Sequence, residues 1–339
     1  ASGQSNSGNT AVGKDALLAI TDGTYNVAVG LSAADSLTGG DFNTIVGRGA
    51  GAAITTMDSM TLIGHMAGEV IDNTAANGTV AIGRDALRAL TSGEKNVAIG
   101  YAALAAITTG EKNVAIGHGA LDVMAGETGE GNAGHFNVAI GADAMGAVDA
   151  GTHDSAVSNS NIAIGNAALL GGDFGTSDKD LLGNIAIGSS AMASTGTNAQ
   201  TGTIAIGYAA LNALTSGAGN IAIGKSSQDA TTVGEYNVSI GTNSLGAIVD
   251  GDFNTAVGHQ SLEVYEGGDG EGSNTAVGFN AGQYCHTGEN SVFIGKSAGQ
   301  GISGSELTGN SNTAVGYRAG MLLQVASENN TMLGAQAGD

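Results

Sequence analysis

The feature that most constrains this chain is a short phrase that returns along its whole length, most often every seventeen residues. The segment 94–117 begins and ends with the same seven letters, EKNVAIG. We call the glycine that closes each phrase position 0 and number the rest of the repeat from it. The position 0 glycines are Gly13, Gly30, Gly47, Gly64, Gly83, Gly100, Gly117, Gly141, Gly165, Gly188, Gly207, Gly224, Gly241, Gly258, Gly278, Gly295, Gly316 and Gly334. Eighteen copies in 339 residues identify a repeat protein.

The residues just before position 0 predict a short strand. Positions −3 and −1 are β-branched in nearly every copy, and position −2 between them is usually alanine. This alternation is typical of a strand with one bulky face and one close-packed face. We expect the bulky Val, Ile and Leu side chains to form the core, and Ile99 to point into its coil.

Further positions predict the turns around this strand. Position −4 is asparagine in most copies, for example Asn26, Asn96 and Asn113, and stacked asparagine side chains can bond one another in a ladder. The exceptions at this position are Met60, Thr79, Thr203 and Ser291. The glycine at position 0 is expected to turn the chain, with a positive φ or a close backbone approach. Ala or Ser at +3 and frequent Leu or Met at +4 predict a second short strand or turn with one large core residue.

The length of the unit selects the fold class. Seventeen residues are too few for a helical hairpin repeat or a propeller blade, but they fit one coil of a parallel β-solenoid. The absence of proline agrees with a continuous hydrogen-bonded ladder. The competing interpretation is helical, because runs such as DALRAL have good helix propensity; these runs are short and end at Gly or Thr-Gly. We therefore predict an all-β parallel solenoid of about 18 coils over 1–339, as a single continuous domain.

Composition and net charge limit the kinds of partner that this chain can bind. The formal net charge of −21 argues against nucleic acid and against anionic membrane surfaces, and no apolar run reaches the roughly 18 residues of a membrane helix. Cys285 is the only cysteine, so an intrachain disulfide is excluded. No signal peptide is recognised, and the start at Ala1 is compatible with a removed leader or with a segment of a longer product.

Several phrases of the sequence resemble known fibre proteins. Residues 273–282 (SNTAVGFNAG), 290–299 (NSVFIGKSAG) and 312–320 (NTAVGYRAG) are similar to the repetitive shaft of phage tail fibres and to the left-handed parallel β-roll heads of trimeric autotransporter adhesins. The resemblance covers essentially the whole chain. It implies a left-handed coil, three chains side by side, and a role in binding a cell surface. It also implies that small residues such as Ala28, Ala98, Ala115 and Ala222 point inward, at the shared axis or in the roll.

The chain also departs from these families. The coils are longer than those of adhesin heads, and stalk heptads, a membrane anchor and a chaperone domain are not visible. The first strand is expected by residue 9 and the last repeat ends near residue 339, so caps that would cover a terminal strand edge are negligible. This suggests either a segment of a longer fibre or subunits that stack head to tail into an open filament.

Three consecutive long repeats, within 118–188, mark a candidate binding surface. The intervals that end at Gly141, Gly165 and Gly188 are 24, 24 and 23 residues long. They are expected to project loops at 126–136, 150–161 and 171–183, and loops on a scaffold are where binding is common. The alternative is that these loops are tolerated insertions without a partner.

Two segments match nucleotide-binding motifs by their letters, but the sequence around them argues against nucleotide binding. Residues 219–226 (GNIAIGKS) match the phosphate-loop pattern, but the stretch between the glycines is the repeat's own strand. Residues 129–134 (GEGNAG) match a dinucleotide fingerprint inside a glycine-rich insertion without the required helix. We therefore predict no catalytic, cofactor-binding or metal site residue.

Histidine and cysteine do not form a recognisable site either. The histidines are His65, His118, His135, His153, His259 and His286. They lack paired zinc-ligand spacing, and Cys285 has no sign of activation as a nucleophile. Acidic turns leave calcium as an open alternative to solvated corners, although their spacing falls short of a calcium loop. These turns are 39–42, 171–174, 250–253 and 267–272.

Together, the patterns predict a non-enzymatic structural fibre protein that is extracellular, on a cell surface or a virion. We expect it to self-associate, as a trimer or as a head-to-tail polymer, and to serve adhesion or reach. The alternative is a receptor- or glycan-binding adhesin module that acts through the three long loops. No nucleic-acid partner and no membrane insertion are expected.

Overall fold

The computed structural model describes residues 6–123, 134–147, 158–171, 180–195, 200–268, 270 and 272–338. The chain is an all-β parallel solenoid of about 16–18 coils with almost no helix, which confirms the predicted fold class. It divides into two compact units, Ala1–Leu182 and Gly183–Asp339. We describe each unit by itself.

The first unit contains eleven parallel strands and one 3₁₀ turn among its described residues. The strands are β1 (Thr10–Val12), β2 (Val27–Val29), β3 (Thr44–Val46), β4 (Thr61–Ile63), β5 (Val80–Ile82), β6 (Val97–Ile99), β7 (Val114–Ile116), β8 (Val138–Ile140), β10 (Ile162–Ile164) and the two-residue pair β9 (Ser158–Asn159) and β11 (Leu181–Leu182). Strictly three-residue strands thus number nine, with the short pair beside them. The 3₁₀ turn η1 (Thr74–Ala76) is capped by Asn73, whose side chain accepts a hydrogen bond from the Ala75 amide.

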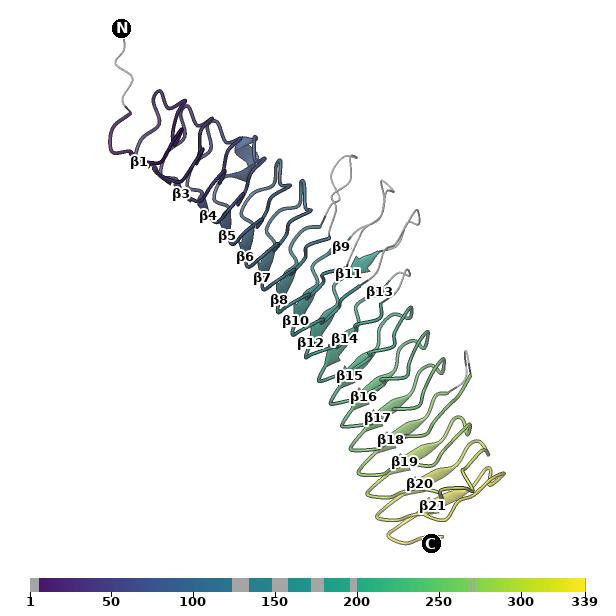
Figure 1. Ribbon diagram of the computed structural model, residues 1–339. Coiled ribbons are helices and arrows are strands. Elements are labelled where there is room, and N and C mark those ends of the chain that lie inside the picture. Colours follow the sequence, from purple (N-terminus) through teal and green to yellow (C-terminus); the bar gives the residue numbers. More distant parts are fainter. Residues whose placement is uncertain are drawn as a thin grey trace. The chain divides into compact units, whose positions relative to one another are not determined.

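The second unit repeats the same pattern. Its strands are β12 (Ile185–Ile187), β13 (Gln200–Thr201), β14 (Ile204–Ile206), β15 (Ile221–Ile223), β16 (Val238–Ile240), β17 (Thr255–Val257), β18 (Thr275–Val277), β19 (Val292–Ile294), β20 (Thr313–Val315) and β21 (Thr331–Leu333). Figure 1 labels the strands of both units in chain order. In each repeat the three-residue strand occupies positions −3 to −1, where the sequence predicted it.

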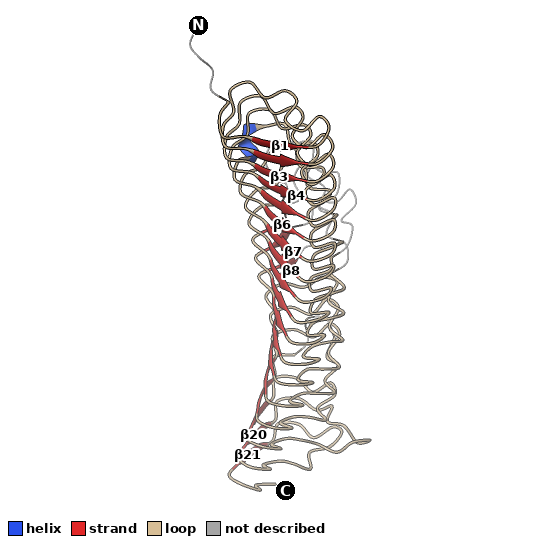
Figure 2. Cartoon of the chain, turned by 60° about the vertical axis from the view of Figure 1, so that its left-hand side comes forward, coloured by secondary structure: helices blue, strands red, loops and turns tan. Residues whose placement is uncertain are grey.

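Successive strands pair in parallel without any slip in register. Val97 of β6 faces Val114 of β7, and Ala98 faces Ala115. The backbone bonds continue past the strand, since the amide of Gly117 donates to the carbonyl of Ile99 at 2.8 Å. In Figure 2 the labelled strands β3 to β8 lie one beside the next in a single ladder. Each coil is therefore a template for its neighbour, which is why the sequence repeats.

The orientation of the strand corrects one prediction. Ala98 at position −2 is fully buried, whereas Val97 and Ile99 on either side of it are only partly buried and face outward. The expectation that Ile99 points into its coil is wrong. The coil is too narrow for two β-branched side chains, because its interior is filled from other positions of the repeat. Ala28, Ala98, Ala115 and Ala222 are all fully buried, as the resemblance implied.

Four positions of the repeat fill the interior. Position −2 is buried together with Ala or Ser at +3, the residue at +4 and an aliphatic residue at +7. The +4 residues Leu87, Leu104 and Met145 are fully buried, which confirms one large core residue there. Aliphatic core residues at +7 are Leu37, Ile54, Ile71, Leu90, Ile107, Leu214 and Ile248.

The volumes at −2 and +4 compensate each other. Where −2 is large, as at Ile45, Leu62 and Phe293, position +4 of the same coil is glycine. A β-carbon on Gly68 would meet the Leu62 side chain at 3.0 Å, so the glycine makes room for the leucine. Gly282 and Gly320 follow alanine at −2, and their β-carbons would instead meet large −2 residues of the next coil, Phe293 and Met332. Glycine at +4 thus makes room for a large residue in its own or the next coil.

The segment after position 0 is a turn rather than the second strand that the sequence left open. Gly100 has a φ of +141°, which confirms the predicted positive φ at position 0. Positions +2 and +4 are also left-handed, even when they are not glycine, as at Ala102 (φ +52°) and Leu104 (φ +53°). The Leu104 amide donates to Ala120 of the next coil at 2.9 Å, so bonds between coils hold this backbone in place.

Candidate interaction surfaces

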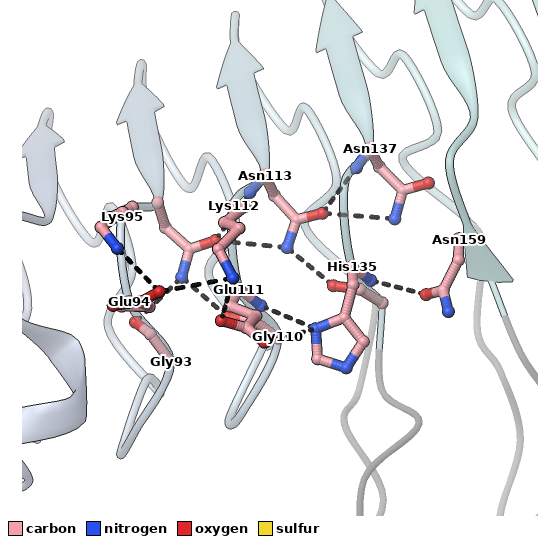
Figure 3. A network of polar contacts seen from close by, with 12 residues as sticks. Gly93, Glu94, Lys95, Gly110, Glu111, Lys112, Asn113, His135, Asn137 and Asn159 are labelled. Carbon is pink, nitrogen blue, oxygen red and sulfur yellow. Dashed lines mark hydrogen bonds and ion pairs between the residues drawn. The ribbon is translucent and has the colours of Figure 1, made fainter.

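A ladder of buried asparagine side chains at position −4 joins the coils, as predicted. Oδ1 of Asn96 accepts from the backbone amide of Asn113 at 3.0 Å and from its Nδ2 at 3.2 Å. Nδ2 of Asn113 also donates forward to the Gly134 carbonyl at 2.7 Å. Figure 3 shows the same arrangement between Asn113 and Asn137. The Asn113 side chain therefore bonds two buried backbone groups of the following coil, and its Nδ2 also reaches Oδ1 of Asn96 in the preceding coil.

The exceptions to asparagine keep part of the ladder. The Met60 amide still donates to Oδ1 of Asn43 at 2.9 Å, although Met60 offers no acceptor of its own. Ser291 replaces the missing amide with its hydroxyl, because its Oγ accepts from the Asn312 amide at 3.1 Å. The coil backbone thus tolerates these substitutions, at the loss of one or two side-chain bonds.

A charged network lies beside the ladder in the first unit (Figure 3). Lys112 Nζ lies 2.8 Å from a carboxylate oxygen of Glu111 and 3.3 Å from one of Glu94, which also pairs with Lys95 at 2.8 Å. The hydrogen bond to Glu111 raises the pKa of Lys112. The hydrogen bond from Lys95, followed by that from Lys112, lowers the pKa of Glu94. Exposed pairs of this kind contribute little to stability, so the network mainly sets side-chain orientation.

The outward residues at −3 and −1 form a continuous surface that we call the aliphatic stripe. In the first unit it is made entirely of Val and Ile over five consecutive coils, from Val80 to Ile164. In the second unit it is so over the four coils from Ile185 to Ile240. These side chains are half-buried, and Ile164, Ile240, Val277 and Ile294 are more than one third exposed. The alternation at −3, −2 and −1 is visible in the sequence. The stripe was not predicted, because the bulky residues were expected to point inward.

A shallow groove in the first unit lies on the turns that follow successive strands. It is lined by Val70, Ala102, Ala106 and the pair Glu69–Arg88, whose carboxylate and Nε lie 3.0 Å apart. Asp85 and further alanines complete the lining.

The predicted loop surface lies mostly outside the described residues. Of the loops 126–136, 150–161 and 171–183, only 134–136, 158–161, 171 and 180–183 are described. In the described part, Ser158–Asn159 pairs in parallel with Leu181–Leu182, and Oδ1 of Asn159 accepts from the His135 amide at 2.6 Å. The bases of these loops therefore stay in register with the coils.

The apparent nucleotide motifs take the positions that the repeat predicts. In the segment 219–226 the residues Ile221–Ile223 are strand β15, and Gly224 is an ordinary position 0 glycine with a φ of +138°. The phosphate-loop pattern is therefore part of a coil. The segment 129–134 lies outside the described residues except for Gly134.

Several histidines approach carboxylates singly, and His286 directly follows Cys285 in the chain. His65, His118 and His286 each approach a single carboxylate, at 4.0, 3.6 and 3.3 Å respectively. His153 lies outside the described residues. Cys285 is fully buried, and burial raises the pKa of its thiol to about 12. A thiol with so high a pKa is a weak nucleophile at neutral pH.

In the acidic turns that suggested a calcium site, described carboxylates accept hydrogen bonds from neighbouring coils. Asp41 Oδ1 accepts from the Thr24 amide at 2.6 Å and from its hydroxyl at 2.8 Å. Asp252 Oδ1 accepts from the Glu235 amide at 2.7 Å. Within the described part of the chain, no three His, Cys, Asp or Glu side chains gather as a metal site would require. The turn 171–174 is described only at Gly171, and Asp269 and Glu271 of the turn 267–272 lie outside the described residues.

Comparisons with protein-family models, with curated proteins and with solved structures give no match to this chain. Among the residues that the structure describes, no helix has the length and apolar character to cross a membrane. The surfaces of the coils are therefore the features of this chain that bear on its function.

Proposed function

We propose that this chain is a non-enzymatic structural fibre protein, extracellular and borne on a cell surface or a virion, that self-associates and serves adhesion or reach. Its polar groups support a structural role, because the buried asparagine side chains are engaged in bonds between coils. The resemblance to phage tail-fibre shafts and trimeric adhesin heads supports the same class. The left-handed winding and the trimer stay predictions of that resemblance.

The observation that carries the proposal is the aliphatic stripe. It presents uncharged, β-branched side chains on five successive three-residue strands of the first unit, from β5 (Val80–Ile82) through β6, β7 and β8 to β10 (Ile162–Ile164). Contiguous exposed apolar surface of this kind marks an interaction site. Val and Ile are held stiffly in a strand, so their burial against a partner loses little side-chain entropy.

The proposed occupant of the stripe is a second copy of the same chain. A stripe that repeats with the period of the coils is complementary to another stripe with that period, and symmetric association uses the same patch on each subunit. The net charge of −21 opposes contact elsewhere on the surface, so it favours association through the uncharged stripe alone. A trimer would bring three stripes together around a shared axis, whereas a head-to-tail polymer would join the terminal coils instead of the stripe.

The test is the mass of the particle in solution, measured by sedimentation velocity over a hundredfold range of concentration. We expect the wild type to sediment as an oligomer, and the double variant Ile99→Asp/Ile116→Asp to sediment as a smaller species with unchanged circular dichroism. A matched control, Lys95→Asp, changes charge beside the same coil but outside the stripe and should leave the mass unchanged. A wild-type monomer at all concentrations would refute self-association.

The alternative function, a receptor- or glycan-binding adhesin module, is favoured by the three consecutive long repeats in 118–188. In that case the loops 126–136, 150–161 and 171–183 hold the binding residues. Shortening all three loops to the modal repeat length should then abolish saturable binding to cells and leave the oligomer intact. Unchanged cell binding by the shortened protein would reject this alternative.

A further inference from the structure

Position +1 of the repeat forms a second exposed row, immediately after the glycine that ends each strand. In the second unit, seven consecutive coils place the following residues there: Tyr208, Lys225, Thr242, His259, Phe279, Lys296 and Tyr317. We call this set the ring–cation row. All but Thr242 are exposed, with Tyr208 at 59%, Phe279 at 47% and Tyr317 at 48%.

Neighbouring members of the row are in contact along the ladder. The rings of His259 and Phe279 stack with centroids 5.3 Å apart and planes at 8°. Lys296 Nζ lies 5.7 Å from the centroid of the Phe279 ring. Register between the coils holds these side chains in line. The Phe279 ring turns its faces toward His259 and Lys296 of the neighbouring coils, so it presents its edge to solvent beside the ammonium groups.

The cations of this row are not neutralised by the row beside it. Position +2 carries Ala209, Ser226, Asn243, Gln260, Asn280, Ser297 and Arg318 in the same coils, so it contains no acidic side chain. In the described residues, Lys225 and Lys296 have no carboxylate within ion-pair distance. This is unusual for a chain with 31 acidic and 10 basic residues.

The first unit also has ring–cation contacts at +1, since Arg84 lies 5.5 Å from the centroid of the Tyr101 ring. It differs in that some of its +1 cations pair with aspartates at +2, as in Arg84–Asp85 at 3.0 Å and Lys14–Asp15 at 3.6 Å. The +1 side chain His118 likewise lies 3.6 Å from Asp143. Because the backbone is the same in both units, the difference lies in the chosen side chains alone.

The nearest acidic side chains of the second unit lie at +5, across a groove that Lys225 also lines. Glu263 accepts hydrogen bonds from Gln260 and from Gln283, both at 2.7 Å, which hold its carboxylate at +5. Asp229 is partly buried, and this burial raises its pKa. These carboxylates line the groove beside the row.

The row has an internal period of four coils. Tyr208 is followed one coil later by Lys225, and Phe279 is followed one coil later by Lys296. The second ring–lysine pair lies four coils after the first, which is about 19 Å at about 4.8 Å per coil. Thr242 and His259 supply hydrogen-bonding groups in between. A surface with such a period fits a linear ligand with sparse, regularly spaced charges.

We propose that the ring–cation row of the second unit binds a linear acidic polysaccharide that runs along the coils. The exposed rings of Tyr208, Phe279 and Tyr317 contact the apolar faces of sugar rings, Phe279 through its edge. Lys225 and Lys296 pair with carboxylate, sulfate or phosphate groups of the polymer. This inference does not depend on self-association through the aliphatic stripe.

Nucleic acid fits the row less well than an acidic polysaccharide. Its phosphates are far more closely spaced than two lysines about 19 Å apart can neutralise. The surrounding surface of a chain with net charge −21 would repel the remaining phosphates. A polysaccharide with one charge in several sugars avoids this repulsion.

The experiment measures binding of the full chain by titration calorimetry to four probes at low and at moderate salt. The probes are hyaluronate (carboxylate), dextran sulfate (sulfate), neutral dextran and single-stranded oligo(dT). We expect at least one acidic polysaccharide to bind more tightly than the other two classes, with affinity that falls as salt rises. The carboxylate and sulfate arms identify the anionic group.

Variants then locate the site. Lys225→Gln/Lys296→Gln and Tyr208→Ala/Phe279→Ala should each weaken binding about tenfold, as expected for loss of two contacts of about 0.7 kcal/mol each. The control Arg84→Gln/His118→Gln alters the same position in the first unit, where the side chains face aspartates, and should leave affinity unchanged. Sedimentation of every variant separates a lost ligand site from lost self-association.

Three results would overturn the proposal. These are absence of binding to both acidic polysaccharides, tighter binding to oligo(dT) or to neutral dextran, and equal loss of affinity in the control variant.

Discussion

The carbonyl group of Gly117 occupies the space that a β-carbon on Gly100 would need. The same relationship joins Gly83 to Gly100 and Gly117 to Gly141, one coil further on each time. Position 0 therefore requires glycine for two reasons at once, a φ near +140° and a backbone contact with the next coil. This explains why the closing glycine is present in all eighteen repeats.

Replacement of Gly100 by alanine should destabilise the fold strongly. The β-carbon would force the neighbouring backbone away and break the adjacent ladder bonds, with a cost of roughly 3 kcal/mol or more in the free energy of unfolding. Gly78→Ala is the matched control, because Gly78 also has a positive φ (+74°) but no atom within 4 Å of its β-carbon position. We expect about 1 kcal/mol there. Equal denaturation midpoints for the two variants would show that the close approach is unimportant.

Loss of one asparagine from the ladder should be felt mainly on the following coil. In Asn113→Ala, the amide of Asn137 and the carbonyl of Gly134 lose their buried partner. We expect a loss of roughly 2–4 kcal/mol from two such groups, measured by urea denaturation. Asn166→Ala removes an exposed asparagine with one bond to Ala142 and should cost less than about 1 kcal/mol. Similar costs for both would contradict the role of the ladder.

A charge introduced on the inward face of a strand should reduce stability much more than a charge on its outward face. Ala98→Asp places a carboxylate in the interior and should cost about 3–5 kcal/mol. Ile99→Asp places it on the aliphatic stripe and should change the stability of the isolated coil stack by about 1 kcal/mol. Thermal unfolding monitored by circular dichroism at low protein concentration distinguishes them. A lower melting temperature for Ile99→Asp than for Ala98→Asp would reverse the assignment of the two faces.

Cys285 gives the fold a sensitivity to alkaline pH. Burial raises the pKa of its thiol from 9.0 to about 12, so the folded state holds the proton more tightly than the unfolded state. Its contribution is complete below pH 9 and is lost as pH rises toward 12, at about 1.4 kcal/mol per pH unit. The variant Cys285→Ala should lack this component of the slope between pH 9 and 11. Identical slopes for the variant and the wild type would exclude the thiol as a cause.

The sequence alone predicts the backbone better than the surfaces. The strand at −3 to −1, the positive φ at position 0 and the asparagine ladder follow from residue types that have few other uses at a fixed spacing. The alternation Val97–Ala98–Ile99 predicts a strand equally well with either face inward. Hydrophobicity alone predicts that the bulky face points inward. The alanine points inward instead, because residues at +3, +4 and +7 fill the coil and leave little width.

Two further features could not have been read from residue types. Left-handed backbone at Ala102 and Leu104 contradicts local preference, and it exists because the next coil accepts the amide hydrogen bond of Leu104. The ring–cation row is visible in the sequence only once position +1 is known to be exposed. Its side chains are seventeen or more residues apart, and only the register of the coils brings them into line.

The asparagine ladder has a direction: each Oδ1 accepts from the following coil, and each Nδ2 donates to the carbonyl of the coil after its own. Where successive coils carry asparagine at −4, as at Asn96, Asn113 and Asn137, each coil therefore meets the same groups before and behind it. In such a run, an in-frame duplication or deletion of one whole unit would present the same groups at the new junction, so the number of coils can change over evolutionary time without redesign of the ladder.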